Sequence, residues 1–394
     1  MNEYHIEEIP VGKLVECAER ALVDKKTFPF LPISLDRAIA QANNPAASED
    51  DIGLILAFYN EICIGYRGLL PCLVNVGRDT DIVNAPSTFY IAPEYRGKKL
   101  IDNITIAEKI NTVAIEQKHD FLGTGFSQQA IRYYQSDKRF QSLSPLPYLR
   151  INIGWLSPFS SIFKKLSRIN KISQLRGFFN FCTHIVSITL DRLINIALKS
   201  WINPVGSGTS AHFNAVKVNT ISALTNDSTD GESSQQIKIH RDVDVINWML
   251  NYPWIKNDQS IQSRYHFATP RTRFEFLPYH LIDRAKNKRV GYAVYSISVQ
   301  DEFTTLKILD YKTLNDKIEL FVLANALDIA RREDVNTIEC SMDFWKYIEG
   351  KGLLRKVTRS SNRVYAVYGK KGGLFEQQSF NIELNYTDCD KPYT

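Results

Sequence analysis

A chain of 394 residues with 44% hydrophobic and 23% charged residues is long enough for two or three domains and too apolar for a disordered or collagen-like protein. Its formal net charge of +5 is small, and most of it comes from residues 155–203, which hold seven Lys or Arg residues and one Asp. Because this excess is local, the composition does not indicate nucleic acid as a partner.

The six cysteines are dispersed without a CxxC pair, and the seven histidines form no pair at metal-ligand spacing. We therefore expect no metal site, and scattered cysteines in a long chain fit a reducing compartment. The first residues are acidic and lack an apolar run, so we expect no secretory signal there. The longest uncharged stretch, Gly177–Leu190, is shorter than the about 20 residues of a membrane-spanning helix. These features predict a cytoplasmic protein.

Residues 1–154 are predicted to form a first lobe with a central sheet. Apolar residues at helical spacing predict helices, and runs of β-branched and aromatic residues predict strands. In chain order, the predicted elements are a helix over 11–23, a helix over 35–42, strands over 52–58 and 62–76 joined by a tight turn, a strand over 87–91, a helix over 99–117, a strand over 121–123 and a helix over 127–135.

Residues 155–203 are predicted to form a basic helical insert, and a polar linker, residues 204–236, follows it. The insert begins with an apolar stripe that is interrupted by Lys164, Lys165 and further basic residues. Such a helix fits an anionic membrane surface. A helical pair that packs on the neighbouring lobes, with its charges in water, would give the same pattern.

Residues 237–375 are predicted to form a second, divergent lobe, with a peripheral tail over 376–394. The predicted elements are a helix over 243–250, strands over 265–276, 289–299 and 305–309, a helix over 316–331, a strand over 337–340, a helix over 343–348 and a strand over 363–368. This order repeats that of the first lobe and indicates an internal duplication. The predicted fold class is α/β of the α+β type, with two mixed-sheet lobes.

One motif in the first lobe points to chemistry. In Ile91-Ala-Pro-Glu-Tyr-Arg-Gly-Lys-Lys-Leu100, a strand leads into a basic turn that contains glycine, and a helix is predicted to begin at once. Helix N-termini and turn amides bind phosphates, although a solvated basic turn would have the same sequence. Tyr134 follows on the later helix, where a phenol can donate a proton to a leaving thiolate or can simply pack against the sheet.

Residues Ile91–Ile101 resemble the pyrophosphate motif of the GNAT superfamily of acyl-CoA N-acyltransferases, hydrophobic-x-Pro-x-Tyr-Arg-Gly-Lys-Gly-x-Gly. In this motif, Lys99 and Ile101 replace two family glycines. Residues 121–140 resemble the next block of that family, a strand followed by Ala-x-x-x-Tyr. The resemblance implies an acyl-CoA donor and Tyr134 as the general acid. It also implies these ligand-binding residues: Phe89 and Ile91 at the pantetheine arm, Arg96, Gly97, Lys98 and Lys99 at the diphosphate, and Ser127 beside them.

The implied reaction transfers an acetyl or other acyl group from acyl-CoA to an amine by direct attack on the thioester. The general base is not assigned, because Glu61, Asp81 and Glu94 are most simply solvated carboxylates. Residues 311–316 have no Arg-Gly-Lys turn, so we expect the second lobe to shape the acceptor cleft and to bind no second CoA. With a membrane-bound insert, the acceptor would be a small-molecule or lipid-linked amine, such as an envelope or polysaccharide precursor, and the protein would be peripheral on the inner membrane face.

Two other functions fit parts of the pattern. A non-catalytic acyl-CoA-binding or membrane-docking protein on a degenerate GNAT pair would explain Ile101 and the missing second turn. An aminoacyl transferase of the Fem type would share the two-lobed plan but would need a broad basic groove, which the charge outside 155–203 does not supply.

Overall fold

The computed structural model describes the chain over residues 4–77, 79–101, 103–124, 134, 139–153, 209, 211–224, 236–255, 264–267, 271–300, 303–370, 373–376 and 381–389. Two compact units are present, each assembled from segments that are distant in sequence. Unit 1 comprises Met1–Pro147, Val218–Phe276 and Asn362–Thr394, and unit 2 comprises Tyr148–Lys217 and Leu277–Ser361. The predicted insert, residues 155–203, lies outside the described residues, as do 204–208 and 225–235 of the predicted linker.

Unit 1 is built on a mixed sheet with the strand order β1-β2-β3-β4-β7-β17-β8, to which β11 and β18 are added beside β3. Its elements are β1 (Tyr4–Pro10), a 3-10 turn (Val11–Lys13), α1 (Leu14–Val23), α2 (Leu35–Ala42), β2 (Ile52–Tyr59), β3 (Ile62–Val76), β4 (Asp79–Ile91), a 3-10 turn (Pro93–Tyr95), β5 (Lys99–Ile101), β6 (Ile104–Thr105), α3 (Ile106–Ile115), β7 (Asp120–Thr124), β8 (Gln141–Ser142), β11 (Gln236–Ile239), α8 (Val243–Asn251), β17 (Tyr365–Tyr368) and β18 (Asn381–Glu383).

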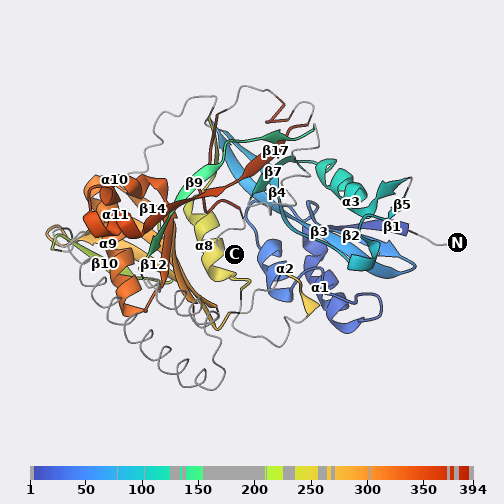
Figure 1. Ribbon diagram of the computed structural model, residues 1–394, viewed down its shortest axis with the longest axis horizontal. Helices are drawn as coiled ribbons and strands as arrows, with labels where there is room; N and C mark the ends of the chain where they lie inside the picture. Colours follow the sequence, from blue (N-terminus) through green and yellow to red (C-terminus); the bar gives the residue numbers. More distant parts are fainter. Residues whose placement is uncertain are drawn as a thin grey trace, which may run out of the picture. The chain divides into compact units, whose positions relative to one another are not determined.

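In the first half of unit 1, the sequence prediction missed β1 and the first eight residues of β4, which begins at Asp79 and not at residue 87. Both predicted helices and the β2–β3 hairpin are present, and Asn60 and Glu61 in the hairpin turn both have positive φ, as a tight two-residue turn requires. β2 is buried on both faces because its residues alternate between two cores. Leu54, Leu56 and Phe58 belong to the core that contains α1 and α2, whereas Ile55 and Ala57 belong to the core that contains α3. Figure 1 shows α1 and α2 on one side of this sheet and α3 on the other.

Unit 2 has its own mixed sheet, with the strand order β10-β12-β13-β14-β15-β9-β16. Its elements are β9 (Leu146–Asn152), β10 (Phe213–Lys217), β12 (Arg273–Asp283), β13 (Lys288–Gln300), β14 (Phe303–Thr313), α9 (Asp316–Arg332), β15 (Thr337–Ser341), a 3-10 turn (Met342–Phe344), α10 (Trp345–Ile348), α11 (Gly352–Val357) and β16 (Thr358–Arg363). One core packs α9 against the sheet. The predicted α+β class with two mixed sheets is confirmed.

The two units repeat one arrangement. In each, a long antiparallel hairpin, β3–β4 or β13–β14, leads to a helix, and the strand after the helix pairs in parallel with the second hairpin strand. This recurrence agrees with the duplication inferred from the sequence.

The units differ from the contiguous lobes predicted at 1–154 and 237–375, because strands are exchanged between distant parts of the chain. β17, near the C-terminus, enters the sheet of unit 1 between β7 and β8, where Tyr365–Tyr368 pairs with Phe121–Thr124. β9, which follows β8 directly, enters the sheet of unit 2 and pairs with β15. Local periodicity identifies a strand but not its partner, so the exchange was not predictable from the pattern.

The predicted peripheral tail, 376–394, is integrated into unit 1 over residues 381–389. β18 pairs with β11, and the side chain of Tyr386 is buried. The buried carboxylate of Asp388 accepts a hydrogen bond of 2.7 Å from Arg241. The expectation of a peripheral tail is therefore wrong for these residues. Among the residues that the structure describes, the helices lack the length and apolar character that crossing a bilayer requires.

We expect the Asp120→Ala substitution to destabilise unit 1 by about 1–3 kcal/mol, because two backbone amides, one buried and one partly buried, lose their acceptor. The buried Asp120 carboxylate, at the start of β7, accepts hydrogen bonds from the backbone N–H of Lys370 (3.0 Å) and of Phe375 (2.9 Å). Urea denaturation of the full chain measures the loss. Asp79→Ala, at an exposed position on β4, is the control, and equal stabilities of the two variants would contradict the prediction.

Candidate functional site

The parallel pairing of β4 with β7 stops after two positions. The paired residues are Val83 with Asp120 and Asn84 with Phe121, although β4 continues to Ile91. Among the described residues, the stretch from Ala85 to Ile91 therefore has no strand partner on this side. Backbone N–H and C=O groups need partners, so such a stretch can bind an extended ligand that carries amides. Phe89 and Ile91, which the sequence predicts as ligand-binding residues, lie in this stretch.

A β-bulge lies within the same stretch of β4. Arg67 pairs with Phe89 but Leu69 pairs with Pro86, so Ser87 and Thr88 together oppose Gly68 of β3. A Cβ atom at Gly68 would lie 2.6 Å from Thr88 Oγ1 and 2.8 Å from Ser87 Oγ, which explains the glycine. A bulge leaves one backbone residue unpaired and redirects side chains.

Two side-chain polar atoms on β4 are buried without a hydrogen-bond partner. They are Asn84 Oδ1, at the last pair with β7, and Ser87 Oγ, in the bulge. Buried polar atoms without a partner cost about 1–3 kcal/mol each, so their persistence needs an explanation. A ligand that donates or accepts hydrogen bonds along β4 would supply one.

The basic turn follows β4 after the 3-10 turn at Pro93–Tyr95. Gly97 has φ +72°, a conformation that favours glycine, and the side chains of Arg96, Lys98 and Lys99 are exposed. Arg96 folds back onto the strand end, where its Nε donates a hydrogen bond of 2.8 Å to the carbonyl of Ile91. The turn thus presents three cations beside the C-terminal end of β4.

The predicted helix over 99–117 begins seven residues later than expected. Residues Lys99–Ile101 (β5) and Ile104–Thr105 (β6) form a small hairpin, and α3 begins only at Ile106. Asn103 in the hairpin turn has φ +62°, and Ile101, Ile104 and Thr105 are β-branched. The apolar spacing that predicted a helix therefore includes two short strands.

The N-terminus of α3 is capped by its own side chains. Thr105 Oγ1 accepts a hydrogen bond of 3.2 Å from the Glu108 amide, and Glu108 Oε2 accepts one of 2.7 Å from the Thr105 amide. The hydrogen bond from the Thr105 backbone lowers the pKa of Glu108, so the carboxylate is ionised at neutral pH. The positive charge near this helix end therefore comes from the turn, whereas Glu108 opposes the binding of an anion to the helix itself.

Tyr134 is buried, with 3% of its surface exposed, and packs with Phe121 and Phe140 in the core around α3. Its hydroxyl accepts a hydrogen bond from Arg67 Nη2. The Arg67 guanidinium also lies 5.1 Å from the ring centroid of Phe89 on β4 and 5.5 Å from that of Phe121 on β7. These contacts bring Tyr134 to the place where β4 and β7 separate.

The sequence reasoning did not single out Arg67. Its signal was present, because Arg67 is the one charged residue in the fifteen residues of β3. The predicted Ser127 lies outside the described residues, as do residues 128–133. Of the other predicted residues, the structure brings together Phe89, Ile91 and Tyr134, and it places Arg96–Lys99 at the exposed end of β4. In the described ranges, no group of three His, Cys, Asp or Glu side chains is arranged to hold a metal ion.

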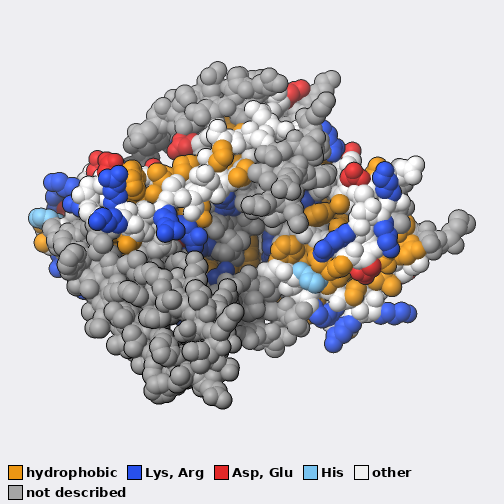
Figure 2. Space-filling model, viewed as in Figure 1, with side chains coloured by type: hydrophobic (Ala, Val, Ile, Leu, Met, Phe, Trp, Pro, Cys, Tyr) orange, Lys and Arg blue, Asp and Glu red, His pale blue; other side chains and the backbone are white. Residues whose placement is uncertain are grey.

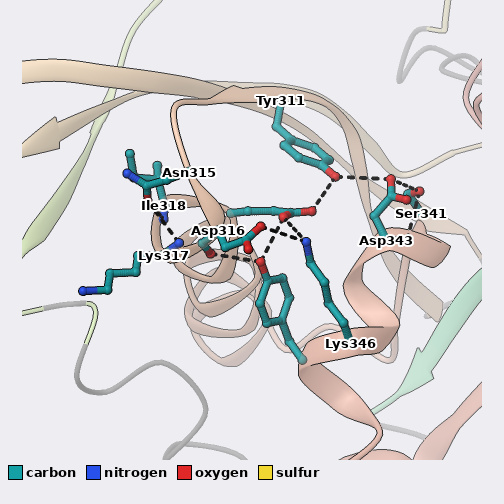
Figure 3. Close-up of polar contacts among 10 residues, drawn as sticks. Tyr311, Asn315, Asp316, Lys317, Ile318, Ser341, Asp343 and Lys346 are labelled. Atoms are coloured by element: carbon teal, nitrogen blue, oxygen red, sulfur yellow. Dashed lines mark hydrogen bonds and ion pairs between the residues drawn. The ribbon is translucent and has the colours of Figure 1, made fainter.

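The corresponding helix end in unit 2 is acidic (Figure 3). Asn315 caps α9, and Lys346 Nζ lies 3.0 Å from Asp316 Oδ1 and 2.7 Å from Glu319 Oε2. Tyr311 donates a hydrogen bond of 3.1 Å to Glu319, and burial, followed by the charges of Asp343 and Glu319, raises the pKa of Tyr311. A diphosphate at this position would meet carboxylates and not a basic turn.

The chain is similar to several solved structures, all at low identity. A protein of unknown function from Enterococcus faecalis V583, described as a probable N-acyltransferase, is 13% identical (TM-score 0.42), and the match covers 93% of this chain and 72% of that one. A GCN5-related N-acetyltransferase from Anabaena variabilis ATCC 29413 is 11% identical (TM-score 0.41; coverage 92% and 72%). The N-myristoyltransferase of Saccharomyces cerevisiae with bound myristoyl-CoA is 9% identical (TM-score 0.42; coverage 93% and 78%). No family model matches the sequence, and no curated protein does.

The capping of α3 generates a stability prediction. Thr105→Ala is expected to lower the free energy of unfolding by about 1 kcal/mol in urea denaturation. Because the pKa of Glu108 is lower in the folded chain, its contribution is present above the unfolded value of about 4.3 and is lost as pH falls through the folded value. The stability difference between wild type and Glu108→Gln should therefore be constant above about pH 5 and should shrink towards acid.

Ser34→Ala is the matched control for this measurement. Ser34 caps α2 by accepting a hydrogen bond from the amide of Arg37, which stands where α3 has its glutamate. Its effect should not depend on pH between 3 and 7 in the way that Glu108→Gln does. A Glu108→Gln difference that is unchanged at about pH 3.5 would contradict the prediction.

Proposed function

We propose that this chain is an acyl-CoA-dependent N-acyltransferase whose donor site is the separation of β4 and β7 in unit 1. The observation that carries the proposal is the stretch of β4 from Ala85 to Ile91, which has no strand partner on the β7 side among the described residues and has Tyr134 beside it. The pantetheine arm of CoA is an extended chain with two amides, so it can add to β4 as a further strand would. The GNAT-like motif at Ile91–Ile101 lies at the end of this same strand.

The bulge supports placing the reacting thioester near Ser87 and Thr88. An unpaired backbone amide in a bulge can donate to the carbonyl oxygen that becomes negative when an amine attacks. The amine adds to the carbonyl carbon, the C–S bond breaks, and the electron pair stays on sulfur. In our proposal the Tyr134 phenol then gives its proton to that thiolate, which releases the thiol of CoA and leaves the amide on the acceptor.

The diphosphate is assigned to the turn formed by Arg96, Gly97, Lys98 and Lys99. Three cations at an exposed turn can bind an anion without a large desolvation cost. Since Glu108 occupies the N-terminus of α3, the helix itself contributes less than the motif implied, and the side chains contribute more. Donor binding should consequently weaken as salt rises.

A non-catalytic acyl-CoA-binding protein is the second candidate, and the burial of Tyr134 favours it. With 3% of its surface exposed, Tyr134 could be a purely structural side chain. An aminoacyl transferase that uses a tRNA-borne donor is less well supported. On the face drawn in Figure 2, the described Lys and Arg side chains of unit 1 stand apart, with hydrophobic and polar side chains between them, and they form no continuous basic surface.

We propose that the acceptor is an amine, and more specifically an envelope or polysaccharide precursor. This part depends on residues 155–203, whose basic and apolar residues favour attachment to the inner face of an anionic membrane. Glu61, Asp81 and Glu94 remain ordinary exposed carboxylates in this proposal. No general base is assigned among the described residues.

We expect Tyr134→Phe to lower kcat by about 10²–10⁴-fold and to leave the Kd for acetyl-CoA within about two-fold, because the hydroxyl serves the departing thiolate and not donor binding. Thiol release from acetyl-CoA with a panel of amines measures kcat, and calorimetry measures Kd. Tyr252→Phe, which removes the exposed hydroxyl bonded to Asn43 in the same unit, is the control. Donor binding by wild type without turnover of any amine would favour the binding protein, and no binding would exclude both candidates.

The membrane proposal has a separate test. The full chain should sediment with anionic vesicles that contain about 30% phosphatidylserine at low salt. Each basic residue near such a surface contributes about 1 kcal/mol to the binding free energy, and these contributions add. A variant with Lys164, Lys165, Arg168 and Lys171 changed to Gln should remain in the supernatant. A variant with four exposed cations of unit 2, Lys286, Lys288, Arg331 and Lys346, changed to Gln provides a charge-matched comparison. Equal sedimentation of all three proteins would exclude attachment through 155–203.

A further inference from the structure

Arg67 is a buried cation in an apolar part of unit 1. It lies in the middle of β3, with 4% of its surface exposed, and it pairs across strands with Phe89 of β4. An isolated charge in such surroundings is costly unless an opposite charge or strong hydrogen bonds compensate for it. The groups around Arg67 therefore indicate what the charge is for.

Among the described residues, the partners of Arg67 are all neutral. Its Nη1 donates a hydrogen bond of 2.7 Å to Asn111 Oδ1 on α3, and its Nη2 donates to the Tyr134 hydroxyl. The rings of Phe89, Phe121 and Tyr134 lie around the guanidinium at 5.1–5.9 Å from their centroids. Its Nε is buried without a partner. Within the described ranges, no ion pair joins Arg67 to a carboxylate, although Arg241 in the same unit pairs with Asp388 at 2.7 Å.

We propose that Arg67 is the positioning residue for Tyr134, and that it stabilises the negative charge that the phenol acquires on giving up its proton. The inference rests on the proposed acyl transfer. When the C–S bond breaks, the electron pair moves to sulfur, the Tyr134 proton moves to that sulfur, and the phenolate remains. The acceptor nitrogen loses its extra proton to water, and the phenolate later takes a proton from solvent, so that charge and protons balance.

The geometry explains why this charge forms at low cost. A cation whose described partners are neutral before the reaction keeps its attraction available for an anion that appears during it, and a buried site strengthens that attraction. The guanidinium already donates to the oxygen that becomes negative, so no group has to move. Asn111 fixes the other side of the guanidinium from α3, which orients the fork towards Tyr134.

The test measures kcat, KM and unfolding for Arg67→Met, Arg67→Lys, Tyr134→Phe, and the Arg67→Met/Tyr134→Phe double variant in the full chain, with acetyl-CoA and the best amine. Arg67→Met should lower kcat by about 10²–10³-fold with a KM change below about three-fold. In the double variant kcat should be no lower than in Tyr134→Phe alone, because the two side chains act on one step. Arg67→Lys keeps the positive charge, so its kcat should be at least about ten-fold higher than that of Arg67→Met.

The control is Arg37→Met. Arg37 is also buried in unit 1, donates to a tyrosine hydroxyl, that of Tyr265, at 3.3 Å, and lies 5.0 Å from the ring of Trp254. It matches the loss of packing and of a guanidinium–tyrosine hydrogen bond, so its kcat should stay at the wild-type value. Asn111→Leu keeps Arg67 but removes one of its hydrogen-bond acceptors, and it should lower kcat less than Arg67→Met does. It replaces Arg67→Met in the test if Arg67→Met does not fold.

The outcomes separate the two levels of the proposal. Absence of turnover by the wild-type chain would overturn the acyltransferase and, with it, the role of Arg67. Wild-type turnover with an unchanged kcat in Arg67→Met, or in Asn111→Leu if Arg67→Met does not fold, would overturn the role of Arg67 alone. Multiplicative losses in the double variant, or an equal loss in Arg37→Met, would likewise reduce Arg67 to a structural residue.

Discussion

Unit 1 depends on a sheet in which two parallel neighbours, β4 and β7, stay paired for two positions and then part. Parallel strands twist relative to each other, and nothing holds them together once hydrogen bonding ends. On its other side β4 pairs with β3 over nearly its whole length, so one edge of β4 is held, whereas beyond Asn84 the other edge has no strand partner among the described residues. The bulge, the buried Ser87 and Asn84 oxygens, and the Arg67–Tyr134 contact all lie along this strand or against it.

The sequence was informative wherever one short segment sets its own conformation. Helix α2 was predicted to the residue, and the turn after β2 follows from Asn60 and Glu61. It failed at residues 99–105, where apolar spacing suited a helix but β-branched residues and Asn103 formed a hairpin. Of the candidate site, Tyr134 and the β4 residues were identified through a family-like motif. Arg67 was missed because its meaning depends on a partner 67 residues away.

The two units use the same arrangement with opposite charge. After β4 comes a turn with three exposed cations, whereas after β14 comes Asn315, followed by Asp316 and Glu319 on the first turn of α9. In unit 2 the local cation, Lys346, pairs with those acids, and Tyr347 donates to Glu319 at 2.9 Å. The polar groups at this helix end of unit 2 are thus satisfied by one another, although buried polar atoms without a hydrogen-bond partner occur in both units, such as Ser87 Oγ in unit 1 and Ser296 Oγ in unit 2. The difference in charge between the two helix ends is the reason why our proposal places the donor site in unit 1.

The exchange of strands has a consequence for how the protein is made. The contact between Asp120 and Lys370 spans 250 residues, and β17 enters the sheet of unit 1 next to β7. At about 5–20 residues per second, a ribosome takes on the order of 12–50 s to synthesise the intervening chain. During that interval β7 has an unpaired edge, which is a site for aggregation. The sheet of unit 1 is therefore completed only after β17 has been synthesised, and the edge of β7 stays exposed until then.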